Sequence, residues 1–456
     1  MNRSARVLTR PRFRFLTSAF LVPFAFCLLP LSAFCLLPLS AAQAWRAAAV
    51  SSFDDAWQVI NDTFYDPTFG GLDWAAVKRE LRPRAEAAAT PEAARGVIRE
   101  MLARLKRSHF ALMTASPVDL LPGPAVVGAE IRMIPEGALV TRVAGEPAAG
   151  AGLAAGQTIV AIDDRDVADL VRLAAGPDAK TRQLDAWRRV NQILHGADGS
   201  TAVLRVRTAD GKIRELTVPR TGAEGEVVTL GNLPPLHVAF ESRELATPAG
   251  RRAGYVCFSV WMTAIGEPFE RAVDQYRRHE GLIIDLRGNP GGLAAMIRGI
   301  AGHVLAEPVV LGTMRTRSVP EPLVFTANPR TVMSDGRQVA PFAGPVAILV
   351  DELTGSTSEV FAGALQSLGR ARIFGRQTMG QALPALTRQL PNGDVLLHAI
   401  GDFVTSSGRS LEGGGVTPDV TVPLSARSLA AGRDDTIEAA LAWFDRAGRR
   451  PEVASK

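Results

Sequence analysis

The sequence that decides the fold class is GLIIDLRGNPGG, residues 281–292. It opens with a short apolar run, typical of a buried strand, which leads into a glycine turn and then into a stretch with helical spacing. A second segment, PVAILVDELTGSTSEVFAGALQSLG at residues 345–369, repeats this plan of strand, turn and helix. Because strands that alternate with helices build α/β structure, we predict an α/β core with a mixed sheet over residues 240–425.

Other parts of the chain flank this core. Over residues 118–221, short β-like runs such as STAVLRVRTADG are separated by Gly, Pro and Asp, which indicates a β-rich module. Within it, residues 167–194 are predicted to form one long helix. Residues 45–117 carry apolar positions at helical spacing and are predicted to form a helical N-terminal domain. Residues 426–456 are expected to form a C-terminal helix and tail, so the fold class is α/β multidomain.

The N-terminus has the pattern of an export signal. Several arginines precede an apolar run over residues 15–39, and the small-residue sequence AAQA then stands before Trp45. We therefore predict a signal peptide at residues 1–44 and an exported, periplasmic or extracytoplasmic protein. If the run stayed uncleaved, it is long enough to anchor the chain in a membrane. Cleavage would leave Cys257 as the single cysteine, so no disulfide is expected within the mature chain.

The composition is that of an ordinary globular protein, with 47% hydrophobic and 21% charged residues. The formal net charge is +5, but the basic residues are scattered among acidic ones, and no basic run is interleaved with aromatics. We therefore expect no nucleic-acid partner. The histidines are too scattered along the sequence to indicate a metal site, and no cofactor is expected.

The two predicted turns between strand and helix carry the first candidate residues. Gly291 and Gly292 leave backbone N–H groups that can approach an anion closely. Ser356 stands at the start of the second helix, near free N–H groups and the positive end of the helix dipole. However, Ser356-x-x-Glu359 is also the pattern of a capping box, which needs no catalysis, and the glycine pair alone could be a tight turn. The spacing by itself leaves both interpretations open.

Together, these segments resemble the signature of the C-terminal processing (tail-specific) serine proteases, whose nucleophile is a Ser three residues before a Glu. The match rests on LIIDLRGNPGG and on GSTSEVFAGALQSLGRARIFGRQTMGQ. Carried over to this chain, it makes Ser356 the nucleophile. The resemblance covers most of the mature chain, because a helical segment, a PDZ-like module and an α/β core follow one another in the family's order.

The resemblance also implies a role for the β-rich module at residues 118–221. VVGAEI and EPAAGAGLAAGQTIVAIDD are similar to a PDZ-like module, which binds peptide C-termini by strand addition and holds their carboxylate on backbone N–H groups. Val126, Val127 and Gly128 would form this carboxylate-binding loop, in place of the usual G-φ-G sequence.

One position departs from the family pattern. Many of these proteases pair the Ser with a Lys in the motif T-F-G-K-G, and the corresponding residue here is Gln381, in TMGQA. No lysine occurs between Lys212 and Lys456. A Ser–Lys dyad of that kind is therefore excluded within the predicted core.

A related branch, similar to the core of the tricorn protease, uses a different base. Its base is a histidine in a Ser-His pair at the end of the helical segment, supported by a distant glutamate. The matching residues here are Ser108 and His109 in RLKRSHFALM, and Glu412 in GRSLEGGGVTPDV. This resemblance implies His109 as general base, since histidine titrates near neutral pH, with Glu412 orienting it through the Ser108 hydroxyl. Taken singly, each residue also fits an ordinary helix end or loop.

The expected function is that of a serine endopeptidase acting on polypeptides through an acyl-enzyme. Backbone N–H groups of Thr357 and of Gly291 or Gly292 would stabilise the oxyanion. One alternative is a catalytically inactive scaffold that binds peptides through the PDZ-like module. Another is a different acyl-transfer or hydrolytic reaction on the same architecture, since a fold does not determine a function.

Overall fold

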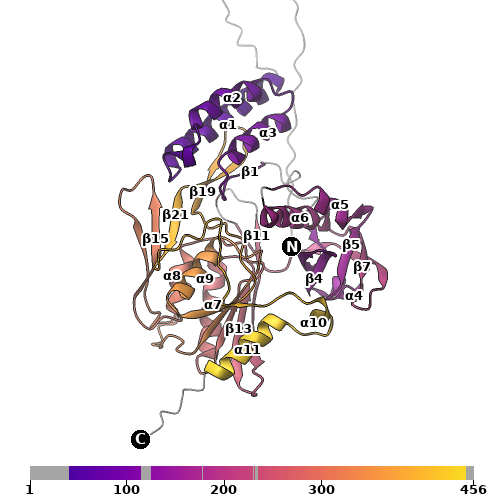
Figure 1. Ribbon diagram of the computed structural model, residues 1–456, viewed down its shortest axis with the longest axis vertical. Coiled ribbons are helices and arrows are strands. Elements are labelled where there is room, and N and C mark those ends of the chain that lie inside the picture. Colours follow the sequence, from indigo (N-terminus) through magenta and orange to yellow (C-terminus); the bar gives the residue numbers. More distant parts are fainter. Residues whose placement is uncertain (1–40, 115–124, 177, 230, 232–234, 448–456) are drawn as a thin grey trace, which may run out of the picture.

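The computed structural model describes residues 41–114, 125–176, 178–229, 231 and 235–447. Three helices lie at one end of the molecule, a large sheet lies at the centre, and a β module lies beside that sheet (Figure 1). The predicted signal peptide at residues 1–44 falls almost wholly outside the described residues. Of the helices in the described part of the chain, none is long and apolar enough to cross a membrane.

The central sheet has six strands in the order β12-β13-β14-β17-β18-β22. Their bounds are β12 (Phe240–Ala246), β13 (Arg252–Phe258), β14 (Leu282–Asp285), β17 (Val346–Val350), β18 (Ala371–Gly375) and β22 (Val420–Thr421). Strand β12 pairs antiparallel with β13 and the other neighbours are parallel, which confirms the predicted mixed sheet. Every residue of β14 and β17 is buried, as expected for apolar strands covered on both faces.

Helices cover both faces of this sheet. They are α7 (Gly266–Tyr276), α8 (Met296–Gly302), α9 (Thr357–Ser367) and α11 (Asp435–Ala447), and the short helix α10 (Ala426–Ala430) precedes α11 in the chain. Ile284 and Ile348 share a core with α7, α8 and α9, whereas Ile283 and Leu349 share one with α11. Successive side chains of a strand point to opposite faces, so one apolar run supplies both cores. A smaller sheet lies beside them, with β15 (Val309–Thr316) between β16 (Leu323–Ala327) and β21 (Gly401–Thr405).

The N-terminal helices do not form their core alone. They are α1 (Ala41–Thr63), α2 (Trp74–Glu86) and α3 (Pro91–Ala103), and their hydrophobic core includes Leu383, Leu390 and Leu396 from a distant hairpin. That hairpin is β19 (Ala385–Gln389) with β20 (Val395–Ala399), and β20 also pairs with β1 (Ala111–Met113). The pairing holds the segment between α3 and β1 against the core, which positions the loop that carries Ser108 and His109.

The β module, residues 125–222, is built around the strand order β3-β4-β5-β7-β8, with β6 beside β5. Its strands are β2 (Ala125–Val126), β3 (Ala129–Ile134), β4 (Gly137–Val143), β5 (Thr158–Ile162), β6 (Arg165–Asp166), β7 (Thr201–Arg207), β8 (Ile213–Pro219) and β9 (Thr221–Gly222), and its helices are α4 (Glu146–Gly150), α5 (Val167–Arg172) and α6 (Ala179–Leu194). A short hairpin, β10 (Glu226–Val228) with β11 (Leu236–Val238), follows it.

The predicted single helix at 167–194 is wrong. Two helices form instead, because Asp178 caps a new start by accepting a hydrogen bond from Thr181 N–H at 2.8 Å.

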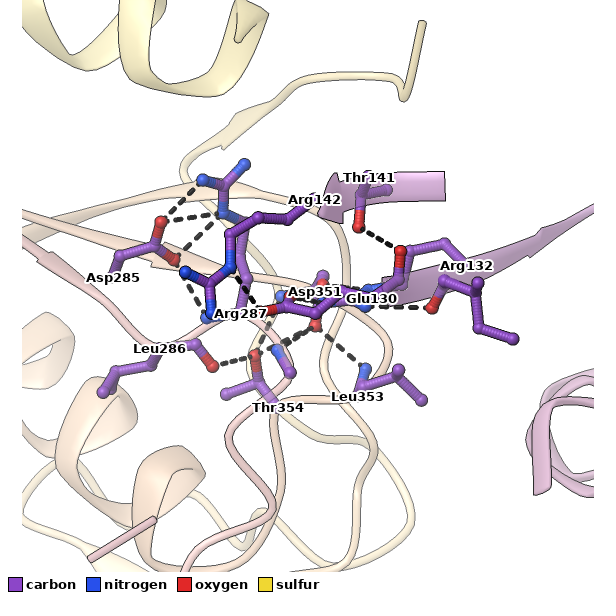
Figure 2. Close-up of polar contacts among 12 residues, drawn as sticks. Glu130, Arg132, Thr141, Arg142, Asp285, Leu286, Arg287, Asp351, Leu353 and Thr354 are labelled. Carbon is purple, nitrogen blue, oxygen red and sulfur yellow. Dashed lines mark hydrogen bonds and ion pairs between the residues drawn. The ribbon is translucent and has the colours of Figure 1, made fainter. Parts of the chain in front are cut away.

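A buried ion pair joins the β module to the core. Figure 2 shows Arg132 of β3 reaching Asp351, the residue that follows β17. Arg132 Nε donates to Asp351 Oδ2 at 2.6 Å, and the two residues are 4% and 1% exposed. Burial raises the pKa of Asp351, but the charges of Arg132 and Arg376 outweigh it and lower that pKa below its usual value. The other Asp351 oxygen accepts a hydrogen bond from Gly288 N–H at 2.9 Å, so the module is tied to both turns of the site.

Candidate active site

Ser356 stands at the turn between β17 and α9 in a strained backbone conformation. Its φ of +51° and ψ of −118° lie in a region that residues with a side chain rarely adopt, at a cost of about 1–3 kcal/mol. Two hydrogen bonds hold it there, because Ser356 N–H donates to Gln381 O at 2.8 Å and to Glu359 Oε2 at 3.2 Å. The Ser356 hydroxyl lies 3.0 Å from His109 Nε2.

His109 comes from the loop between α3 and β1, and it too has a positive φ, of +59°. Its two ring nitrogens contact different hydroxyls: Nε2 lies beside Ser356, and Nδ1 lies 2.8 Å from Ser108 Oγ. The pairing of β1 with β20 brings this loop to the core, so a segment far from Ser356 in the sequence reaches it in space. The 3.0 Å between His109 Nε2 and the Ser356 hydroxyl is within the reach that a general base needs.

Glu412 is linked to His109 through Ser108. Its Oε2 accepts a hydrogen bond from Ser108 Oγ at 2.8 Å, and its Oε1 accepts one from Ser108 N–H at 2.9 Å. A carboxylate only accepts, so the single hydroxyl proton of Ser108 points toward Glu412. Ser108 Oγ must then accept from His109 Nδ1–H. This leaves Nε2 with a free lone pair, aimed at the hydroxyl of Ser356.

Burial also favours the neutral form of this histidine. It lowers the pKa of His109 from 6.5 to about 4, because removing an imidazolium from water without a direct counter-charge is unfavourable. At neutral pH the ring is therefore uncharged and able to take a proton.

The glycine turn at the end of β14 approaches the same hydroxyl. A Cβ on Gly291 would lie 2.6 Å from Ser356 Cβ and 3.0 Å from Thr357 N, so only glycine fits there. Gly291 N–H already donates to Asn289 Oδ1 at 3.0 Å. Of the two predicted glycines, Gly292 is therefore the better candidate to offer its N–H to a substrate. Thr357 Oγ1 donates to Gly292 O at 2.8 Å, which ties this turn to the first residue of α9.

The segment around Gln381 holds Ser356 with backbone atoms. Glu359 is fully buried and accepts hydrogen bonds from Gly380 N–H at 2.6 Å and Gln381 N–H at 2.8 Å. Burial raises the pKa of Glu359 by more than these hydrogen bonds lower it. At the position where the family resemblance places a lysine, the backbone carbonyl of Gln381 thus holds Ser356.

A cavity of about 860 Å³ borders the site through Ser108, Gln381 and Glu412. Its walls come from the α3–β1 loop, the β module and the core. One of its lining residues, Lys180 of α6, was not predicted from the sequence, because it belongs to the β module and not to the core. No local motif marks Lys180, so only its position in the fold reveals it.

The predicted carboxylate-binding loop lies elsewhere in the β module. Val126 ends β2, Val127 is buried, and Gly128 adopts a φ of +65°. A Cβ on Gly128 would lie 2.3 Å from Ala144 O, which explains the glycine. Among the described residues that line the cavity beside Ser108, none comes from this loop, so the structure does not bring the loop to the candidate site.

Comparison with known proteins agrees with this architecture. Residues 252–422 match the model of peptidase family S41, and residues 46–103 match the tricorn protease C1 domain. The photosystem II D1 C-terminal processing protease has a similar structure, with a TM-score of 0.55 and 23% identity over 87% of this chain and 97% of that chain. At that level of identity the likeness shows a shared fold.

Curated relatives extend the match over most of the sequence. The chain is 28% identical to carboxyl-terminal-processing peptidase 3, chloroplastic, of Arabidopsis thaliana, over 80% of this chain and 67% of that protein. It is 27% identical to a carboxyl-terminal-processing protease of Synechocystis sp., over 80% of this chain and 79% of that protein. The chain thus contains a segment, residues 252–422, that matches peptidase family S41, and over most of its length it is similar to carboxyl-terminal-processing proteases, which supports a serine peptidase.

Proposed function

We propose that this chain hydrolyses peptide bonds in exported proteins, with Ser356 as nucleophile and His109 as general base. One observation carries the proposal: a continuous chain of hydrogen bonds runs from Ser356 through His109 and Ser108 to Glu412. These residues come from three segments far apart in the sequence. Each has an ordinary structural explanation alone, but their alignment in the order nucleophile, base, hydroxyl and carboxylate suits acyl transfer.

In the proposed reaction, Ser356 Oγ attacks the carbonyl carbon of the peptide bond while His109 Nε2 takes its proton. The negative charge on the carbonyl oxygen accepts hydrogen bonds from the N–H groups of Gly292 and Thr357. His109 then gives its proton to the leaving amine, and the acyl group remains on Ser356. A water molecule, deprotonated by His109, releases the acid. Glu412, acting through the Ser108 hydroxyl, stabilises the imidazolium formed in both steps.

A serine-directed fluorophosphonate probe tests the nucleophile. We expect stoichiometric labelling of Ser356 in the wild-type chain, because the reagent is attacked as an acyl substrate is. Labelling should disappear in Ser356→Ala and persist in Ser318→Ala, which removes an exposed serine. Mass spectrometry of the labelled peptide identifies the site. An unlabelled wild-type chain would favour the alternative of an inactive peptide-binding scaffold.

The pH dependence of cleavage tests the base. Protonated His109 cannot accept the Ser356 proton, so kcat/KM is lost as the pH falls through the pKa of His109 in the free enzyme. Because burial lowers that pKa to about 4, we expect activity to persist well below pH 6.5. The measurement is kcat/KM from pH 4 to 8 with a fluorogenic peptide that carries no titratable side chain.

Circular dichroism at each pH provides the control, since unfolding in acid would also abolish activity. If kcat/KM fell to half its plateau at or above pH 6.5, the ordinary pKa of histidine, while the protein was still folded, the result would contradict a buried neutral base at His109.

We further propose that the β module acts as a PDZ-like peptide-binding module and that the protein works outside the cytoplasm. The module's mixed strands and helices, with Val126, Val127 and Gly128 before β3, are compatible with strand addition next to a carboxylate-binding loop. The N-terminal apolar run supports export, with membrane contact restricted to residues 15–39 if they remain attached. We propose the division into residues 45–117, 118–221, 240–425 and 426–456, with the β19–β20 hairpin completing the first of these units.

A further inference from the structure

Helix α6 of the β module presents one face to the cavity beside the candidate active site. Lys180, Leu184 and Trp187 all line the cavity, and their spacing of four and three residues places them on the same side of a helix. The cavity also includes Ser108 and Gln381. A substrate polypeptide that enters it would therefore meet α6 on its way to Ser356.

Two polar groups on this helix face lack partners. Lys180 Nζ and Trp187 Nε1 are both buried, and neither has a hydrogen-bond acceptor among the residues that the structure describes. Buried donors without acceptors are rare in folded proteins, since each costs free energy. For Lys180 the cost is greater, because an ammonium group has three donors and a full charge. Burial accordingly lowers the pKa of Lys180. These unused donors point to a ligand.

The ammonium of Lys180 lies close to the segment that holds Ser356. A Cβ on Gly380 would lie 2.9 Å from Lys180 Nζ, so a glycine at this position leaves room for the lysine. The next residue is Gln381, whose carbonyl oxygen accepts the hydrogen bond from Ser356 N–H. A ligand group on Lys180 would therefore belong to a part of the substrate near the bond that is cleaved.

Three carboxylates, those of Glu359, Asp178 and Glu412, act on Lys180 through their charge, and each is already bound by other groups. Asp178 accepts a hydrogen bond from Thr181 N–H at 2.8 Å. Glu359 accepts hydrogen bonds from the backbone of Gly380 and Gln381. Glu412 accepts hydrogen bonds from Ser108 and from Ala382 N–H. None of the three carboxylates makes a hydrogen bond with Lys180 Nζ. The ammonium therefore keeps its hydrogen-bonding capacity for an incoming group.

The charge of the cavity wall indicates whether the group that binds Lys180 is positive or negative. Its basic lining residues outnumber its three acidic ones. They are Arg99, Lys106, Arg107, Arg132 and Lys180. Arg132 is already paired with Asp351, and Lys106 and Arg107 are exposed. Among these five, Lys180 combines a buried charge with free donors, and a carboxylate is the anionic group that polypeptides supply.

We propose that Lys180 binds a carboxylate of the substrate polypeptide and thereby determines which bonds are cleaved. This inference rests on the proposed function. The carboxylate comes either from the C-terminus of the substrate or from an Asp or Glu side chain close to the cleaved bond. Trp187 Nε1 donates to a main-chain carbonyl of the same bound segment.

Paired peptides test the proposal. In one pair the peptides differ only in a free or an amidated C-terminus, and in the other a Glu near the cleaved bond is replaced by Gln. For at least one pair, we expect the wild-type kcat/KM to be about ten- to a hundredfold higher for the peptide that carries the carboxylate. This is the difference that one hydrogen bond to a charged group makes. In Lys180→Met that ratio should fall to about one. The pair that responds identifies the source of the carboxylate.

Lys212→Met is the matched control, because it removes the same charge from the same module at an exposed position. Its ratios should equal those of the wild type. Unchanged ratios in Lys180→Met, or a wild type that prefers neither carboxylate, would overturn the proposal.

A binding measurement separates this proposal from the proposed catalytic function. In the Ser356→Ala background, fluorescence anisotropy should show tighter binding of the carboxylate peptide, and adding Lys180→Met should remove that difference. This result would support the role of Lys180 even if the wild-type chain cleaved none of the peptides. The thermal midpoint provides a second readout without ligand. Lys180→Met should match or exceed the wild type, because it removes an unpaired buried charge, and a clear decrease would show that the ammonium already has a partner.

Discussion

Replacing His109 by alanine should lower kcat/KM for peptide cleavage by roughly ten-thousand- to million-fold, the range found when one member of a serine-protease triad is removed. Without the imidazole, none of the residues that the structure describes offers a base within hydrogen-bond distance of the Ser356 hydroxyl. Steady-state cleavage of a fluorogenic peptide measures the loss. Circular dichroism and the thermal midpoint should stay close to those of the wild type, since His109 lies on the loop between α3 and β1 and not in a helix or strand.

Two further variants separate catalysis from packing. Ser356→Ala should cause a loss of similar size, and the double variant should be no worse than either single one, because nucleophile and base act as a unit. Ser108→Ala should cost much less, since it removes only the link between His109 and Glu412. Near-wild-type turnover in His109→Ala would refute the assignment of the base and direct attention to another group near Ser356.

Replacing Arg132 by alanine should lower the free energy of unfolding by about 3–5 kcal/mol, the usual cost of breaking a buried ion pair from one side. The substitution would leave Asp351 buried with its charge uncompensated by its closest partner, at the turn that leads to Ser356 (Figure 2). Urea denaturation, monitored by intrinsic fluorescence, measures the change as a lower midpoint. We expect cleavage activity to fall as well, because Asp351 also holds the turn of Gly288.

Arg142→Ala is the matched control for Arg132. Arg142 Nε pairs with Glu130 at 2.8 Å in the same module, but both side chains are more than 40% exposed. An exposed pair of this kind contributes less than about 1 kcal/mol. Equal losses of stability in the two variants would mean that burial at the junction does not govern the strength of the Arg132–Asp351 pair.

Much of the fold could be predicted from consecutive residues. The apolar runs that became β14 and β17 were recognisable because parallel strands buried on both faces need apolar side chains at every position. The limits of this reasoning appear at residues 167–194, where helical spacing predicted one helix and the structure has two. A local polar cap at Asp178 outweighed the general periodicity. The hairpin that completes the N-terminal helical core was not predicted, because its leucines lie in the distant segment at residues 383–396.

The sequence by itself determined the α/β core, because strands, turns and helix starts depend on residues that are neighbours in the chain. The resemblance to a protease family, and not the spacing, made Ser356 the candidate nucleophile. The roles of Ser108, His109 and Glu412 came from resemblance and remain predictions. Only the tertiary structure decided which side chains meet: His109 beside Ser356, Arg132 against Asp351, and Lys180 facing the cavity. These contacts depend on how sheets and helices pack across hundreds of residues, and no local pattern of polarity or spacing encodes them.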